Sequence, residues 1–139
     1  GHMHELNQAI RDFQFREHYW LTYKSDHMAA YLKDKKHHFV MNTDSVNVLT
    51  WIINALQSFW FLWTEKPDLI ISTGAGVSFP TIFFGKVFFK CKVIFIVSAA
   101  DVTEPSRTPL KAYPYSDLFL VQWPELLEVF PNAKYIGVL

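Results

Sequence analysis

The stretch PDLIISTGAGVSFPTIFFGKVFFKCKVIFIV, from Pro67 to Val97, decides the fold of this chain. Its apolar runs at Leu69–Ser72 and Val93–Val97 are typical of strands, and a helix-length segment, Phe79–Phe89, separates them. A third run, Leu118–Gln122, follows in SDLFLVQWPELLEVFPNAKYIGVL. Strands that alternate with helices predict a parallel α/β sheet, and such sheets bind ligands where their strands end.

The other segments continue this alternation. We expect further helices at Glu5–Phe15, from a Ser25 cap to Leu32, from an Asp44 or Ser45 cap to Trp63, and over Pro124–Phe130. We expect further strands at Tyr19–Thr22, His38–Met41 and Tyr135–Val138. The pattern predicts one Rossmann-like, doubly wound domain over residues 1–139, with a mainly parallel sheet. The chain opens on a helix where such a domain normally opens on a strand, so a first strand is missing or is supplied by something else.

Composition limits the class of protein. The chain has 139 residues, of which 50% are hydrophobic, 17% aromatic and only 19% charged. These values suit one domain with a substantial core and differ from those of a disordered segment. A small domain cannot hide so many aromatic side chains, so we expect an exposed apolar patch that faces a partner or a membrane.

Charge and cysteine content argue against several kinds of site. The formal net charge is zero, whereas nucleic-acid binders carry a basic excess. Cys91 is the single cysteine, which excludes an internal disulfide and a cysteine-based zinc site. The six histidines lack the ligand spacing of a helical metal site. We therefore predict no nucleic-acid partner, no metal and no cofactor.

The turn after Leu69–Ser72 contains Gly74, Ala75 and Gly76. A helix N-terminus offers free N–H groups to a phosphate or carboxylate, and glycines let a ligand approach the backbone. The dinucleotide fingerprint needs a third glycine, and Phe79 stands in that place. The turn therefore fits either a ligand contact or a tight bend that needs small residues.

Aromatic residues concentrate in two of the expected helices, Asp44–Trp63 and Phe79–Phe89. Seven are candidates for contact with a membrane or a partner: Trp51, Phe59, Trp60, Trp63, Phe83, Phe84 and Phe88. In the first helix they share the surface with an uncharged polar stripe, and in the second they lie near Lys86 and Lys90. The alternative is that these aromatics pack in the core against the sheet.

Five segments in order, ISTGAG, KVIFI, PSRT, DLFLVQW and YIG, resemble the acceptor-binding subunit of two-component glycosyltransferases. Eukaryotes have this subunit in the N-acetylglucosamine transferase that acts on dolichyl-diphosphate sugar, and bacteria have it in capsule and exopolysaccharide synthesis. The likeness extends from about His2 to Leu139, and DLFLVQW after ISTGAG is its most specific part.

The resemblance implies a fold and a role. Such a subunit looks like the N-terminal half of a GT-B glycosyltransferase, and a separate catalytic subunit binds the nucleotide sugar. The implied acceptor is a polyprenyl-diphosphate-linked saccharide. The implied place is the cytoplasmic face of the plasma membrane, where the chain is peripheral and recruits its catalytic partner, so that it does not catalyse alone.

The resemblance also assigns residues. His2 matches the histidine that ends the family's first glycine-rich turn, which gives it an acceptor-side catalytic role if Gly1-His2-Met3 is native sequence and not an expression scar. The turn Gly74–Gly76 would contact the acceptor through backbone N–H groups. The other implied acceptor-binding residues are Ser98, Ser106, Arg107, Thr108 and Lys111.

The chain departs from the family pattern in the loop after Val93–Val97. Val97 replaces a glutamate, Asp101 replaces an arginine, and Pro109-Leu110 replaces Gly-Lys. Arginine is a natural partner for diphosphate, so Arg107 or Lys111 is expected to take its place. The departures leave two alternatives open: a module that tethers a catalytic partner and binds no acceptor, and a stand-alone nucleotide-binding enzyme, which the missing third glycine weakens.

The family's first strand, which precedes the glycine-histidine turn, is absent here. Removing a central parallel strand exposes the ladder groups of its neighbours. We therefore expect a marginal monomer, or a homodimer that covers the gap.

Overall fold

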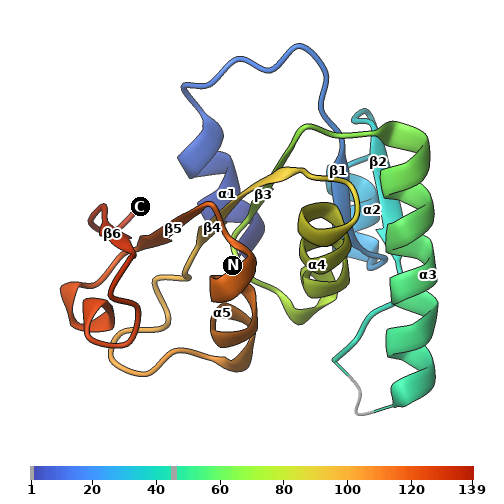
Figure 1. Cartoon of the computed structure of the whole chain (residues 1–139). Coiled ribbons are helices and arrows are strands. Elements are labelled where there is room, and N and C mark those ends of the chain that lie inside the picture. The colour runs from blue at the N-terminus through green and yellow to red at the C-terminus, as the bar shows by residue number, and fades with distance from the viewer. Residues whose placement is uncertain (1, 45–46) are drawn as a thin grey trace.

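The computed structural model describes residues 2–44 and 47–139. Its strands are β1 (Trp20–Tyr23), β2 (His37–Val40), β3 (Leu69–Ser72), β4 (Lys92–Ile96), β5 (Leu118–Val121) and β6 (Lys134–Tyr135). Its α-helices are α1 (His2–Ile10), α2 (Asp26–Tyr31), α3 (Val48–Glu65), α4 (Phe79–Val87) and α5 (Arg107–Ala112). Short 3-10 helices are η1 (Gly76–Ser78), η2 (Tyr113–Tyr115) and η3 (Pro124–Leu127). The predicted α/β alternation is confirmed (Figure 1).

The strands form two parallel sheets. Four strands pair in the order β3-β4-β5-β6, and β1 pairs with β2 in a separate sheet. All the pairs are parallel, with Ile70 opposite Val93 and Phe95 opposite Phe119. The predicted parallel fold class is therefore correct, but the sheet is divided where β1 and β3 would be expected to continue one another.

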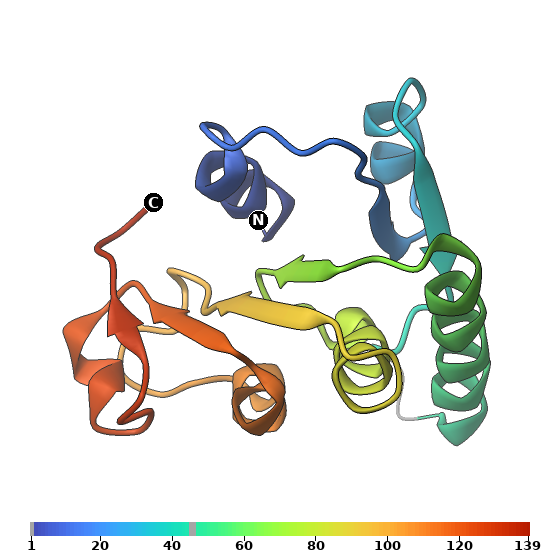
Figure 2. The same ribbon diagram turned by 45° about the horizontal axis from the view of Figure 1, so that its top comes forward.

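A large cavity of about 1520 Å³ lies between the two sheets, and residues of β1, β3 and α1 line it. In Figure 2, α1 lies on the opposite side of the four-stranded sheet from α4 and α5. Trp20 N–H donates to the Lys36 carbonyl, and Lys92 N–H donates to the Asp68 carbonyl. Because successive strand residues point their backbone groups in opposite directions, those of Leu21 and Ile71 face away from their own sheets.

The wall of this cavity contains a buried polar atom. Trp20 Nε1, in its wall, is buried and has no hydrogen-bond partner among the described residues. A buried polar atom without a partner costs free energy, so Trp20 Nε1 is an unfavourable feature of this wall. Among the described residues, β1 pairs only with β2 and β3 pairs only with β4, so the edges of both strands beside the cavity carry no further strand.

The core lies around β4 and β5. Val93, Phe95 and Val97 are fully buried, and Phe119 stacks on Phe95 at a centroid distance of 5.2 Å. Helices α4 and α5 lie on one side of the four-stranded sheet (Figure 2), and Ile82 and Ala112 join the core from them, together with Leu126 and Phe130. A strand covered on both faces requires a continuous apolar run, which explains the KVIFIV sequence.

Helix α3 buries polar side chains and exposes large apolar ones. Its buried residues include Asn54 and Ser58, whereas Leu56, Trp60 and Trp63 expose 68%, 62% and 59% of their surface. The polar stripe faces inward because hydrogen bonds hold it there: Asn54 Nδ2 donates to the carbonyl oxygens of Met41 and Val77, at 2.7 and 3.2 Å. The alternative of a core helix with buried aromatics is therefore wrong for this face. Among the described residues, no helix has the length and hydropathy to cross a membrane.

Several predicted boundaries are wrong. Helix α1 ends at Ile10 rather than Phe15, and Phe13 beyond it is 67% exposed, so no packing extends the helix. Asn47, not Asp44, caps α3, because its Oδ1 accepts from Leu49 N–H at 2.9 Å; Ser45 lies outside the described residues. The polar segment after β4 begins as a loop, as predicted, but from Arg107 onward it forms helix α5. The remaining strands begin and end within one or two residues of the prediction, except β6, which stops at Tyr135. The helix predicted over Pro124–Phe130 is the shorter 3-10 helix η3.

Candidate functional site

The carboxyl ends of β3 and β4 bring together segments far apart in the sequence. Thr73, directly after β3, donates from Oγ1 to the His2 carbonyl at 2.7 Å. Ser98, after β4, donates from Oγ to Glu5 Oε1 at 3.2 Å. The start of α1 is thereby fastened across the ends of both strands. In a parallel sheet this edge is the usual place for a ligand.

The turn Gly74–Gly76 is explained in part by its own backbone. Gly74 has φ +97°, and an added Cβ would lie 3.0 Å from Phe95 Cζ. Its N–H group already donates to Ser72 Oγ at 3.2 Å. Only glycine suits this position, and its N–H is not free for a ligand. The tight-bend interpretation therefore holds for Gly74, whereas Ala75 has no such constraint.

Gly76 lies beside two threonine hydroxyls. A Cβ added to Gly76 would lie 3.6 Å from Thr43 Oγ1 and 3.8 Å from Thr108 Oγ1. Thr43 is only 5% exposed, and its hydroxyl has no hydrogen-bond partner among the described residues. A buried hydroxyl without a partner carries a desolvation penalty, which a ligand oxygen would remove. We call Thr43, Gly76 and Thr108 the threonine niche.

Glu5 organises the loop after β4, and sequence reasoning missed it. Its Oε1 accepts from Ser98 Oγ and, at 3.0 Å, from Ala99 N–H. Trp123 Nε1 holds the same loop by donating to the Ala99 carbonyl at 2.7 Å. Glu5 Oε2 is buried and has no partner among the described residues. The only signal in the sequence was an acidic residue in the first turn of a helix, which more often reflects the helix dipole.

Asp101 holds the beginning of α5. Its Oδ2 accepts from Ser106 N–H at 3.0 Å and from Ser106 Oγ at 2.9 Å. Two of the predicted acceptor hydroxyls, those of Ser98 and Ser106, are thus occupied by carboxylates of the chain itself. Asp101 is one of the departures from the family pattern, and here it has a structural role. Arg107 follows at the surface, exposed to solvent.

His2 opens α1 and is exposed. It lines the large cavity between the sheets together with Thr73 and Ala75. Its position at the carboxyl edge is compatible with the predicted acceptor-side role, and its backbone is fixed there by Thr73. Gly1 lies outside the described residues.

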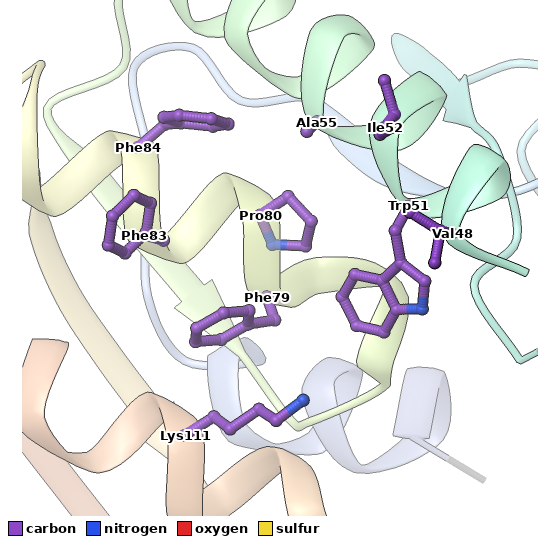
Figure 3. A pocket seen from close by; sticks show the side chains of 9 residues that line it. All are labelled: Val48, Trp51, Ile52, Ala55, Phe79, Pro80, Phe83, Phe84 and Lys111. Atoms are coloured by element: carbon purple, nitrogen blue, oxygen red, sulfur yellow. The ribbon is translucent and has the colours of Figure 1, made fainter. Parts of the chain in front are cut away.

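Lys111 lies away from Ser98 and Ser106, at the end of an apolar groove between α3 and α4. The groove has a volume of about 490 Å³. Its wall contains these residues: Val48, Trp51, Ile52, Ala55, Phe79, Pro80, Phe83, Phe84 and Lys111. Figure 3 shows the Lys111 side chain reaching from α5 past Phe79 towards Trp51. The groove brings Trp51, Phe83, Phe84 and Lys111 together.

The other predicted surface residues lie farther along α3 and α4. Trp60, Trp63 and Phe88 are largely exposed, and Phe59, 38% exposed, packs edge-on against Phe84 and Phe89 at centroid distances of 5.5 and 5.1 Å. Phe59 therefore joins the aromatic residues of α3 to those of α4 and the segment directly after it.

Several titratable groups outside the strand-end loops have shifted pKa values. Hydrogen bonds from Lys36 and His38 lower the pKa of Glu65. Burial, with the nearby Glu65 charge, raises the pKa of Tyr19 to about 12. Hydrogen bonds from Lys86 and from Val93 N–H lower the pKa of Asp117. Within the described residues, no group of three or more metal-ligating side chains could hold a metal ion.

Similarity to known proteins identifies the family of this chain. A family model described as "Oligosaccharide biosynthesis protein Alg14 like" matches residues 1–139. The chain belongs to the Alg14-like family. The resemblance read from ISTGAG and DLFLVQW is therefore confirmed at the level of the family.

Curated relatives share the family name. The UDP-N-acetylglucosamine transferase subunit ALG14 of Kluyveromyces lactis is 35% identical over 78 residues, covering 52% of this chain and 33% of that protein. The subunit of Schizosaccharomyces pombe is 29% identical over 107 residues, covering 65% and 50%. The human subunit is 30% identical over 95 residues, covering 62% and 44%. The matched part of this Alg14-like chain thus spans half or less of each relative's length.

A solved structure confirms the fold. The crystal structure of MurG from Acinetobacter baumannii superposes with a TM-score of 0.73 and 12% identity, covering 90% of this chain and 39% of that one. At this identity the likeness concerns the fold alone. It agrees with the Rossmann-like, GT-B-type half that the sequence predicts for this Alg14-like protein.

Proposed function

We propose that this Alg14-like chain is the accessory subunit of a two-component glycosyltransferase. It recruits a separate catalytic subunit, which binds the nucleotide sugar, and it holds a polyprenyl-diphosphate-linked saccharide as the acceptor. The observation that carries the proposal is that one domain presents two surfaces: the exposed apolar stripe of α3, and the polar edge where His2, Ala75 and the threonine niche lie.

The α3 surface supports a peripheral place on a membrane. From Val48 to Thr64 the helix contains no charged residue, and Leu56, Trp60 and Trp63 point outward while Asn54 and Ser58 are hydrogen-bonded inward. Tryptophans such as Trp60 and Trp63 suit the boundary between headgroups and acyl chains. We place this face on the cytoplasmic side of a membrane. The relatives described above are eukaryotic, so capsule or exopolysaccharide synthesis and the plasma membrane stay predictions.

The polar edge supports a contact with the acceptor. Thr108 and Thr43 present hydroxyls beside Gly76, and Ala75 and His2 lie in the wall of the neighbouring cavity. Transfer of a sugar needs a base near the acceptor hydroxyl, and His2 is the candidate on this side. The nucleotide sugar and its leaving group would be held by the partner.

A tethering module without an acceptor site is the second candidate. It is favoured by one observation, that Ser98 and Ser106 are bonded to Glu5 and Asp101 and are not free. In this alternative the edge loops stabilise one another, and the chain contributes only a membrane surface and a docking surface.

A reconstituted complex distinguishes the two. The chain is combined with a candidate catalytic subunit and a lipid-linked acceptor, and both co-purification and sugar transfer are measured for wild type and Thr108→Val. Acceptor binding predicts that the variant still co-purifies while transfer falls. Unchanged transfer with intact co-purification supports tethering instead. Binding of free nucleotide sugar by this chain alone would contradict both.

A further inference from the structure

We propose that the groove between α3 and α4 holds one isoprenoid chain, with Lys111 at the phosphate attached to it. The inference rests on the proposed function, because it names the part of the acceptor that this subunit grips and the residues that grip it.

The lining of the groove suits a hydrocarbon. Eight of its nine lining residues are apolar, and Lys111 alone carries a charge (Figure 3). The walls come from two helices, with Trp51, Ile52 and Ala55 from α3 facing Phe79 and Phe83 from α4. An isoprenoid chain has neither donors nor acceptors, so its transfer from water to these walls is favourable at about 25 cal/mol per Å².

Lys111 marks one end of the groove as a place for an anion. Its Nζ lies 5.3 Å from the centroid of the Trp51 ring and 5.9 Å from that of Phe79. Among the described residues, no carboxylate lies within ion-pair distance of this ammonium group. A cation over apolar rings without an acidic partner is complementary to a phosphate at the head of a hydrocarbon chain.

Polar groups continue beyond Lys111. Thr108 and Lys111 are three residues apart on α5 and therefore lie on one side of that helix. Thr108 belongs to the threonine niche, where the buried Thr43 hydroxyl has no partner among the described residues. From the groove outward, the surface therefore offers first an apolar wall, then the Lys111 cation, and then the threonine hydroxyls. A polyprenyl-linked saccharide has the same order: chain, phosphate, sugar.

One side of the groove opens towards the proposed membrane face. Val48 and Ile52 line the groove and are also 71% and 50% exposed. They continue into the outward stripe of Leu56 and Trp60 on the same helix. A chain leaving the groove there would pass only uncharged α3 side chains before it reached the bilayer.

Titration of the whole chain with farnesyl diphosphate, followed by calorimetry, tests the inference. Farnesol and inorganic diphosphate are titrated separately, so that the contribution of the hydrocarbon to binding is distinguished from that of the phosphates. We expect saturable binding of farnesyl diphosphate, weaker binding of farnesol and none of inorganic diphosphate. Equal binding of inorganic diphosphate, or no saturable binding of farnesyl diphosphate, overturns the proposal.

Two variants assign the binding to the groove. Lys111→Gln should weaken farnesyl diphosphate about tenfold, the loss expected for a hydrogen bond to a charged group, and leave farnesol unchanged. Lys134→Gln, an exposed lysine on β6, is its matched control. Ala55→Phe should fill the groove and weaken both ligands, whereas Leu56→Ala, one residue along α3 and outside the groove, should not.

Circular dichroism checks that Ala55→Phe is folded, and Ile52→Ser, at an exposed position, repeats the test if it is not. Wild-type affinity in both wall variants and in Lys111→Gln overturns the inference. Failure here is separable from failure of the proposed function. Groove variants that transfer sugar normally in the reconstituted complex reject the groove alone. If the protein recruits no catalytic subunit, the proposed function is rejected. The titration still shows whether the groove binds an isoprenoid.

Discussion

The side-chain amide of Asn54 lies 3.2 Å from the Val77 carbonyl oxygen, and this bond turns the polar stripe of α3 towards the sheet. The same amide also donates to Met41 at 2.7 Å, and Ser58 Oγ donates to Asn54 Oδ1 at 3.0 Å. Since both residues are fully buried, these bonds fix which side of α3 meets solvent. The outward apolar stripe is therefore a consequence of the inward polar one.

Replacing Asn54 tests this orientation. Asn54→Leu would remove the donor and leave the buried bond to the Val77 carbonyl and the half-buried bond to the Met41 carbonyl unmade, so the free energy of unfolding should fall by about 2 kcal/mol. Leu56→Ser changes an exposed apolar side chain of the same helix and should alter it by only about 0.5 kcal/mol. Urea denaturation of both variants measures the difference. Equal losses would mean that α3 does not face the sheet with its polar stripe.

The apolar stripe should bind membranes. The double variant Trp60→Ser, Trp63→Ser should lose most of its binding to phospholipid vesicles, because each buried aromatic ring contributes about 2 kcal/mol. Phe13→Ser removes an equally exposed aromatic residue, 67% exposed, from a different part of the molecule and should bind as wild type does. Sedimentation with vesicles gives the bound fraction. Equal binding by all three proteins would refute the assignment of this face.

Asp117 should make stability depend on pH. Its carboxylate accepts from Lys86 Nζ at 2.5 Å and from Val93 N–H at 2.8 Å, which lowers its pKa. A lowered pKa stabilises the fold above the ordinary carboxyl value of about 4, and the contribution is lost as the pH falls through the lower folded-state value.

Asp117→Asn should therefore reduce the free energy of unfolding at neutral pH by about 1 kcal/mol, a small value because the pair is partly exposed. The difference from wild type should shrink in acid. Glu128→Gln, at an exposed carboxylate without an ion pair among the described residues, should show little change at either pH. Thermal unfolding across the pH range gives the result. A deficit that grows in acid would reverse the sign and contradict the assignment.

The cavity between the sheets should affect assembly. The backbone groups of Leu21 and Ile71 that face it have no ladder partner among the described residues, so an isolated monomer should be marginal, or two copies should associate to cover the gap. Light scattering during a dilution series, combined with urea denaturation, distinguishes these states. A cooperative, stable monomer at every concentration would count against both.

The sequence predicted the parts of the fold that follow from local patterns. The strand Leu69–Ser72 has the predicted bounds, because its β-branched residues Ile70 and Ile71 favour a strand locally. The Ser25 cap is also confirmed, since its hydroxyl accepts from Met28 N–H at 3.1 Å. These features depend on neighbours within a few residues.

Features that depend on distant contacts were missed. Nothing near Glu5 indicated that it would meet Ser98 across 93 positions of sequence. The stripe of Asn54 and Ser58 was visible, but its direction depended on carbonyl groups at Met41 and Val77. Thr43 had no local pattern at all, because its importance comes from Gly76 and Thr108 lying beside it in space.

The central claim is that this chain is a necessary acceptor-side half of a glycosyltransferase. The most direct measurement is the rate of sugar transfer to a polyprenyl-diphosphate-linked acceptor in vesicles, with the catalytic subunit alone and with this chain added. The account predicts transfer only when both chains are present, together with recruitment of the catalytic subunit to the vesicles. Transfer by the catalytic subunit alone at the same rate would contradict it.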